Sequence, residues 1–224
     1  MKILKAAFTL IELIFVIIVL GILTTTFFSY MHDDRLVEAG DQLISHIRYT
    51  QHLAMIDDHY DSSKEDWYKE MWQLFFSKSS DLDKKGWAYT IFSDAYTHTG
   101  KPDPSEIATD PVSRQKKLTG GYTSGASAIK YSDKRSSKSL NLEREYGVQN
   151  VLFSGCGSTA KRLAFDHFGR PYSGDISTAK DPYSRLIKTQ CHIILCMVED
   201  CSEADQDEKI VIAIEPETGF AHFL

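Results

Sequence analysis

Residues 8–31 read FTLIELIFVIIVLGILTTTFFSYM, an apolar run that decides how the rest of the chain is interpreted. At about 1.5 Å of rise per residue, a helix over this run is roughly 36 Å long, enough to cross the hydrocarbon layer of a bilayer. The residues before it, MKILKAA, carry two lysines. The run therefore predicts a membrane-spanning helix close to the start of the chain.

One acidic residue, Glu12, interrupts the apolar run. A lone carboxylate in hydrocarbon costs about 2.5 kcal/mol or more, so a specific partner is expected for it. A secretory signal peptide is one alternative, but the run exceeds the usual length of about 7–15 residues and no A-x-A-like site follows it. An ordinary membrane anchor is another alternative, and it leaves Glu12 unexplained.

The sequence around Glu12, Ala7-Phe8-Thr9-Leu10-Ile11-Glu12-Leu13, resembles the processing site of the type IV pilin and type II secretion pseudopilin superfamily. The resemblance implies that prepilin peptidase cuts between Ala7 and Phe8 and that Phe8 is N-methylated. It also implies that Glu12 neutralises the free amine of a neighbouring subunit during assembly. Ala7 departs from the family, in which Gly more often precedes the cut. A carboxylate is tolerated in a low-dielectric site when an ammonium group lies beside it, and a cut before Phe8 would create such an ammonium group at the new N-terminus.

The rest of the chain has the composition of one acidic globular domain. The 224 residues carry a net charge of −6, and 42% of them are hydrophobic. Lys2, Lys5 and Glu12 are the only charged residues before residue 32. Residues 32–224 therefore hold 23 basic and 30 acidic side chains, a net charge of −7. Such a domain is a poor general binder of nucleic acid or anionic lipid.

The charges that flank the apolar run predict its orientation. Lys2 and Lys5 precede it and Asp33 and Asp34 follow it, so the positive-inside rule leaves the N-terminus in the cytoplasm. The expected localisation is a single pass through the inner membrane, with the head periplasmic or extracellular and associated with a filament after processing. The expected domains are a leader at 1–7, a transmembrane helical half at 8–31, an amphipathic helical half at 32–58 and an exported β-rich head at 59–224.

The apolar spacing beyond the run is that of an amphipathic helix. No proline occurs before Pro102, so one helix of about 50 residues, roughly 75 Å long, is the simplest interpretation. Its second half is expected to bury one stripe against the protein's own sheet, with a partner-binding face as the alternative. The stripe comprises Leu36, Gly40, Leu43, Ile44, Ile47, Gln51 and Ala54.

Segments rich in aromatic and β-branched residues predict antiparallel strands in the head. The predicted fold class is α+β, a long N-terminal helix whose first half spans the membrane, packed on an antiparallel β-sheet head in a pilin-like arrangement. The predicted strands are Trp72–Ser77, Trp87–Ser93, Val148–Phe153, Arg162–Phe165, Gln190–Val198 and Lys209–Ile214, closed by Gly219–Phe223.

The C-terminal part of the head, about residues 148–224, resembles GspH/FimT-like minor pseudopilins and minor pilins. In that family a strand ending in Phe-x-x-x-Gly precedes a hairpin ending in Thr-Gly. Here the first pattern is Phe165 with Gly169, and the second is Thr218 with Gly219. The N-terminal resemblance covers about residues 1–56, and residues 60–140 look like an expansion of the family's plan.

The four cysteines all lie in the last third of the chain: Cys156, Cys191, Cys196 and Cys201. An even number in an exported head predicts disulfides, each worth roughly 2–4 kcal/mol. Of three possible pairings, one joins Cys196 to Cys201 across a short loop and leaves Cys156 to reach Cys191. A zinc site using His192 is an alternative that lacks a Cys-x-x-Cys pair. A Cys156 nucleophile with His167 and Asp166 is another.

Two loops invite ligand interpretations. Asp94, Asp103 and Glu106 are candidate calcium ligands, but their spacing departs from that of a calcium-binding loop, which favours a solvated turn. Residues 112–139 carry a net charge of +6 with interleaved tyrosines, a composition that can grip single-stranded nucleic acid or form a solvated loop. The candidate DNA contacts are Lys116, Lys117, Lys130, Lys134 and Arg135.

These observations predict a structural subunit with no cofactor and no bond chemistry, in a type II secretion pseudopilus or type IV pilus. The expected partners are other pilin or pseudopilin subunits, prepilin peptidase, an inner-membrane assembly platform and a secreted cargo or DNA. A DNA-uptake (competence) or adhesion pilus subunit is the alternative, with the DNA held by the basic loop at 112–139. A membrane-anchored hydrolase is a third class, but no nucleophile, base and orienting group have a recognisable spacing.

Overall fold

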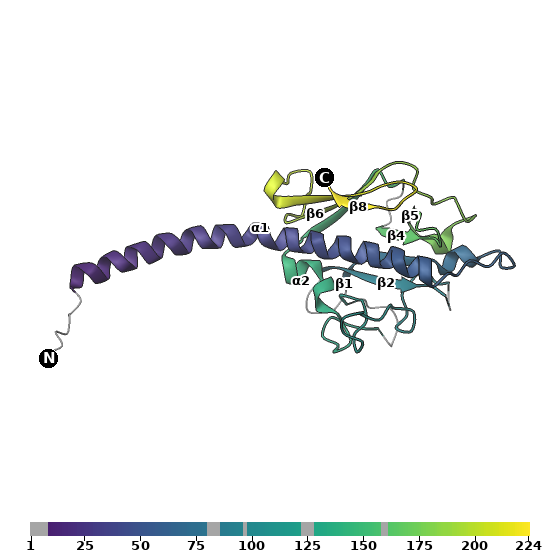
Figure 1. Ribbon diagram of the computed structural model, residues 1–224, viewed down its shortest axis with the longest axis horizontal. Coiled ribbons are helices and arrows are strands. Elements are labelled where there is room, and N and C mark those ends of the chain that lie inside the picture. The colour runs from purple at the N-terminus through teal and green to yellow at the C-terminus, as the bar shows by residue number, and fades with distance from the viewer. Residues whose placement is uncertain (1–8, 80–85, 96–97, 122–127, 158–160) are drawn as a thin grey trace, which may run out of the picture.

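The computed structural model describes residues 9–79, 86–95, 98–121, 128–157 and 161–224, apart from the side chains of residues 25–34. Helix α1 (Leu10–Ile56) runs along the long axis of the molecule, and the head surrounds only its C-terminal part (Figure 1). Its N-cap, Thr9, has the extended backbone typical of that position, with φ −81° and ψ 149°. The free part and the packed part of this one helix define the two ends of the molecule.

The head contains two four-stranded antiparallel sheets, in the strand orders β2-β1-β4-β5 and β3-β6-β7-β8. The first sheet consists of β1 (Trp72–Ser79), β2 (Gly86–Ser93), β4 (Arg162–Phe165) and β5 (Pro171–Ser173). The second consists of β3 (Asn150–Ser154), β6 (Cys191–Cys196), β7 (Lys209–Ile214) and β8 (Ala221–Phe223). The short helices are η1 (Trp67–Glu70), η2 (Lys138–Leu140), α2 (Leu142–Tyr146), η3 (Ile176–Thr178) and η4 (Gln206–Glu208).

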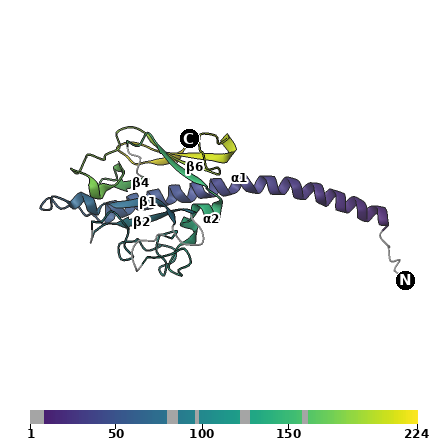
Figure 2. The ribbon, with the colours of Figure 1, turned by 180° about the vertical axis from the view of Figure 1, so that it is seen from behind.

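The C-terminal part of α1 packs against both sheets. It contacts β1 and β4 of the first sheet and β7 and β8 of the second, and both views show a sheet on either side of it (Figures 1 and 2). Leu43 and Ile47 are fully buried there. Gly40 allows β8 to approach closely, because a Cβ atom at this position would lie 2.7 Å from the ring of Phe223. The stripe predicted from the 3.6-residue period therefore forms the centre of the hydrophobic core.

A partly buried polar network also fixes α1 to the head. The hydroxyl of Tyr89 in β2 lies 2.6 Å from Nδ1 of His46 and accepts a hydrogen bond from Nε2 of Gln42 at 3.0 Å. The hydroxyl of Tyr146 in α2 donates to Oε1 of Gln42 at 2.9 Å. Burial lowers the pKa of His46 to about 4, although the carboxylate of Asp110 acts in the opposite direction. The imidazole is therefore neutral at pH 7, and its Nδ1 can accept a hydrogen bond from the hydroxyl of Tyr89.

The predicted fold class is wrong about the head, because the strands form two sheets rather than one. Alternation within a strand marks which side chains are buried, but it does not say which strands pair. Strand β5 was not predicted at all. It is a three-residue edge strand that begins at Pro171, where a missing backbone N–H is tolerated.

The predicted membrane-spanning first half of the helix and the single-pass inner-membrane localisation also require correction. Within the residues that the structure describes, no helix has both the length and the apolar character needed to cross a membrane. The apolar segment with described side chains, residues 10–24, is about 22 Å long, against a hydrocarbon thickness of about 30 Å.

Candidate assembly surface

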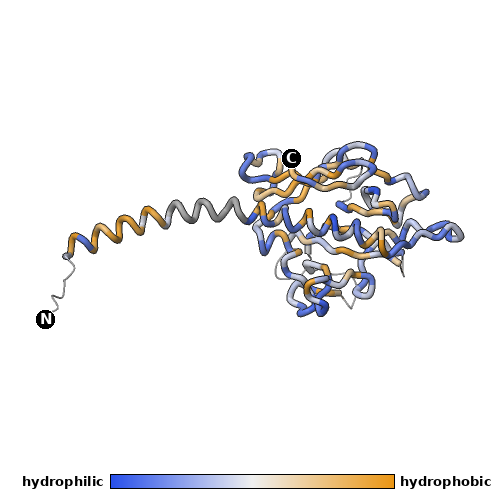
Figure 3. Tube along the Cα trace, viewed as in Figure 1, coloured by the Kyte–Doolittle hydropathy of each residue, from blue (hydrophilic) through white to orange (hydrophobic). Residues whose placement is uncertain are grey.

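The first part of α1 exposes apolar side chains on all of its faces. From Leu10 to Leu23 every described large hydrophobic side chain is at least 39% exposed, and Leu10 and Ile11 reach 76%. Figure 3 shows this segment as a nearly continuous hydrophobic rod outside the head. We call residues 10–24 the free segment. A contiguous exposed apolar surface of this kind marks an interaction site.

Glu12 is the only ionisable residue of the free segment, and it lies in the first turn of α1. Thr9 at the N-cap and Glu12 three residues later have the sequence of a capping box, in which both side chains bond to backbone N–H groups. The structure shows no side-chain cap at this end, and the carboxylate has no hydrogen-bond or ion-pair partner among the described residues. The positive end of the helix dipole favours a carboxylate in the first turn, but it does not supply a hydrogen-bond donor or a cation as a partner for Glu12.

The predicted cleavage and methylation site lies outside the described residues. Ala7 and Phe8 both precede Thr9, where the described chain begins. The predicted roles of Ala7 and Phe8 therefore stay predictions, whereas the position and exposure of Glu12 are observed.

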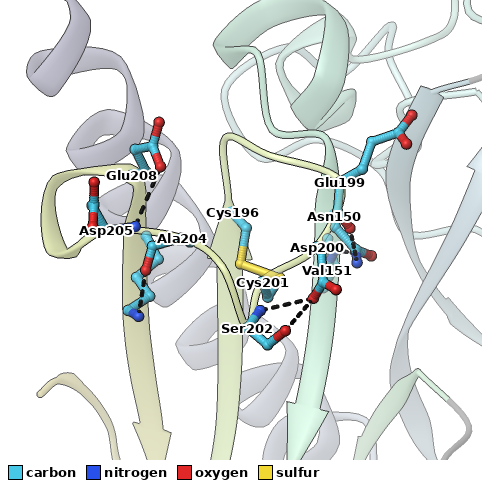
Figure 4. The surroundings of a disulfide bond; sticks show 11 residues. Asn150, Val151, Cys196, Glu199, Asp200, Cys201, Ser202, Ala204, Asp205 and Glu208 are labelled. Atoms are coloured by element: carbon cyan, nitrogen blue, oxygen red, sulfur yellow. Dashed lines mark hydrogen bonds between the residues drawn. A yellow bond between two sulfur atoms is a disulfide. The ribbon is translucent and has the colours of Figure 1, made fainter.

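The structure joins the four cysteines as Cys156–Cys191 and Cys196–Cys201, one of the three connectivities open to the sequence. The second bond closes the turn after β6, where Asp200 accepts hydrogen bonds from the backbone and hydroxyl of Ser202 (Figure 4). With all four sulfurs oxidised, none is a thiolate for zinc beside His192 or a nucleophile beside His167.

The acidic side chains proposed for calcium instead organise their own loop. The carboxylate of Asp94 is buried and accepts hydrogen bonds from the backbone N–H groups of Thr99 and Gly100, at 3.2 and 2.6 Å. The carboxylate of Glu106 accepts one from the N–H of Asp103 at 3.0 Å. Among the described residues, no group of three or more His, Cys, Asp or Glu side chains could hold a metal ion.

The candidate DNA contacts are partly occupied by interactions within the basic loop. The ammonium of Lys117 donates to the carbonyl of Ile107 at 2.8 Å, and burial lowers its pKa. Arg135 forms an ion pair with Asp133 at 2.7 Å. Lys130 and Lys134 are exposed, and Lys116 is half-buried. DNA contact stays a prediction, and it has fewer available cations than the sequence suggested.

Sequence reasoning missed a second group of exposed apolar side chains, located around the C-terminal end of α1. Met55, Phe168 and Phe220 are 48%, 69% and 52% exposed, and we call these three the apolar patch. Arg48 lies at its edge, with its guanidinium carbon 5.5 Å from the ring centre of Phe220. The members are distant in sequence, so only the fold brings them together. The one available signal was Phe168 itself, an aromatic residue just after the predicted strand at 162–165.

A charged cluster beyond the end of α1 was also missed. Glu70, nearly buried, lies between two imidazoles, 3.4 Å from Nδ1 of His59 and 3.3 Å from Nε2 of His98. Nδ1 of His98 lies 3.4 Å from the carboxylate of Asp66, and Nε2 of His59 lies 3.3 Å from that of Asp57. These contacts tie the loops that follow α1 and β2 to each other, away from the free segment.

The geometry of the free segment and the apolar patch is the basis for assigning a function to this chain. No protein-family model, curated protein or solved structure matches it.

Proposed function

We propose that this chain is a structural subunit of a type II secretion pseudopilus or type IV pilus and that it assembles through α1. The observation that carries the proposal is the free segment, an apolar helical rod whose single carboxylate has no partner in the part of the chain that the structure describes. A helix that is hydrophobic all round is stable only when neighbours surround it. Neighbouring helices of other subunits supply that environment.

The energetics favour burial of the free segment. Burying one Leu, Ile, Val or Phe side chain is worth about 1.5–3 kcal/mol, and the segment presents many of them. Leaving the carboxylate of Glu12 unpaired in such an environment would cost several kcal/mol. A cationic partner from another subunit removes that cost. The amine released by a cut before Phe8, the partner that the resemblance implies, has the required charge.

In this proposal the chain performs mechanical work. Prepilin peptidase processes the precursor, an assembly platform adds the subunit to the filament, and the head stays on the outside as a surface or terminal element. The minor-subunit resemblance of residues 148–224 favours a position at the surface or tip. The head contributes its shape and its contacts with a secreted cargo or with other subunits.

Two measurements in cells that assemble the filament test the proposal. Mass spectrometry of the mature chain should find N-methylated phenylalanine, Phe8, as the first residue. Glu12→Ala should leave the amount of precursor unchanged and remove the chain from the filament fraction. The matched control is Glu38→Ala, which changes an exposed carboxylate of the same helix in its head-packed part and should leave incorporation intact. A mature chain that still begins with Met1, or normal incorporation of Glu12→Ala, would overturn the proposal.

A further inference from the structure

We propose that Arg48 is a cationic partner of Glu12 from a second copy of this chain, whose free segment lies along the apolar patch. The inference rests on the proposed function, in which copies assemble through α1. It adds a specific acceptor surface on the head. The free segment and the patch are both apolar, and Glu12 of the first and Arg48 at the edge of the second carry opposite charges without an ion-pair partner among the described residues.

The charge at the patch is available. Nη2 of Arg48 donates to the carbonyl of Ala221 at 3.0 Å, and the guanidinium lies over Phe220. No described carboxylate lies within ion-pair distance of it. By contrast, Arg170, the other guanidinium near the patch, is held by Asp166 at 2.7 Å. A planar guanidinium with free N–H groups suits bidentate binding of a carboxylate.

The patch is rigid because its two turns are attached to α1. Nε2 of Gln51 donates to the carbonyls of Gly169 and Thr218, at 2.8 and 2.7 Å. Both turns contain a glycine with positive φ, Gly169 (79°) and Gly219 (65°). A Cβ atom at Gly169 would lie 3.0 Å from Nε2 of Gln51 and 3.3 Å from the sulfur of Met55. The exposed aromatic rings are therefore presented by a fixed backbone, which lowers the entropic cost of binding.

The Phe168 turn has a further support. Buried Asp166 accepts hydrogen bonds from the backbone N–H groups of Phe168 and Arg170, at 3.0 and 2.9 Å, and from the hydroxyl of Tyr172 at 3.1 Å. This arrangement holds an aromatic side chain in solvent on a preorganised turn. Such anchors are typical of the energetic centres of protein interfaces.

The two unpaired charges cannot meet within one molecule. Glu12 and Arg48 are 36 positions apart on the same helix, which is about 54 Å. The free segment and the patch lie towards opposite ends of the long axis (Figures 1 and 2). Pairing must therefore occur between copies. A repeated contact between different surfaces of identical chains forms either a closed ring or an open helical filament.

The pair also specifies a register. If parallel helices place Glu12 beside Arg48, then Val19 faces Met55, because each lies seven residues further along the same face. The remaining apolar residues of the free segment continue towards the loop after α1. This offset of 36 residues can be tested with a disulfide between copies.

The first experiment is cross-linking of full-length chains coexpressed in cells that assemble the filament. One chain carries Val19→Cys and the other Met55→Cys, and mild oxidation should give a covalent dimer on a non-reducing gel. The matched control replaces Met55→Cys by Val112→Cys, a position that is 94% exposed and does not belong to the apolar patch. A dimer well above that background supports the register. Equal yields from the two pairs would overturn it.

The second experiment asks whether the positive charge of Arg48 is responsible for the contact between copies. In the Val19/Met55 cysteine pair, Arg48→Gln on the Met55→Cys chain should lower the dimer yield about tenfold, while Arg48→Lys should retain most of it. Arg35→Gln, an exposed arginine on the same helix, is the control and should have no effect. Equal losses for Gln and Lys at position 48 would overturn the role of charge. A melting temperature measured for each variant shows whether loss of the Ala221 hydrogen bond has unfolded the head.

These outcomes are separable from the proposed function. If the mature chain begins at Phe8 but gives no Val19–Met55 dimer, the filament proposal stands and this interface is rejected. If a chain that still begins with Met1 gives the specific dimer, the interface is supported and the proposed cleavage before Phe8 is rejected.

Discussion

The two ends of α1 are both rich in apolar residues, yet their surroundings differ completely. Residues 10–24 expose apolar side chains around the whole circumference. Residues 35–56 expose mostly polar side chains, with Val37, Met55 and Ile56 as apolar exceptions, and bury one stripe between two sheets. The stripe needs only the protein's own head to cover it. The uniform surface needs neighbours on all sides, which one head cannot supply. The angular distribution of apolar residues, more than their number, therefore separates the surface that the head covers from the surface that stays exposed.

The largest expected effect comes from matched truncations at the two ends. Ile47→Ala should lower the free energy of unfolding of the isolated chain by about 2–5 kcal/mol, because Ile47 is fully buried. Ile17→Ala, at a position 61% exposed, should change it by less than about 0.5 kcal/mol. Chemical denaturation gives both values. A comparable loss for Ile17→Ala would mean that the isolated chain covers its own free segment.

The next effect is acid sensitivity confined to the packed end. The pKa of His46 falls from 6.5 to about 4 on burial. Its contribution to stability is complete above pH 6.5 and is lost as the pH falls towards 4, because only the unfolded chain then binds the proton. The loss should reach about 3 kcal/mol.

His46→Gln tests this pH dependence. The variant should lack this part of the dependence of unfolding free energy on pH, and His52→Gln, at an exposed position of the same helix, should keep it. Identical pH profiles for the native chain and His46→Gln would show that another group is responsible.

The smallest effect concerns Gln51, which lies between the core and the patch. Gln51→Ala removes two hydrogen bonds to turn carbonyls and should lower the free energy of unfolding by about 1–2 kcal/mol. His52→Ala is the control, and it should cost less. Amide hydrogen exchange should also become faster in the turns around Gly169 and Gly219. Unchanged exchange in these turns would show that other contacts hold them.

Local patterns in the sequence predicted many of the core residues and strands but not how the strands pair. The 3.6-residue period from Leu36 to Ala54 identified the buried stripe, and β-branched and aromatic runs located β1, β2, β4 and β7 to within a few residues. The partition into two sheets was missed, because β3 pairs with β6 about 40 residues later and strand composition does not encode partners. The membrane span was inferred from length and hydropathy alone, and the described structure does not contain one.

The candidate site divides in the same way. Glu12 was evident from sequence, because a single charge in an apolar run is visible without any fold. Arg48 and the patch were not evident, because Met55, Phe168 and Phe220 come from three separate segments joined through Gln51. The basic and acidic loops were visible but ambiguous, since the same side chains serve metal ions, DNA or their own backbone. Only contacts such as Asp94 with Gly100 distinguish these uses.

The close approach of Gly169 and Gly219 to Gln51 has a consequence for how this chain could diverge in sequence. A Cβ atom at Gly219 would lie 2.6 Å from the carbonyl oxygen of Gly169 and 2.7 Å from Nε2 of Gln51. One added methyl group at Gly219 would therefore force the backbone of Gly169 or the side chain of Gln51 to move, and these groups lie between the turns that carry Phe168 and Phe220. Substitutions hidden from every partner could in this way change which partners fit.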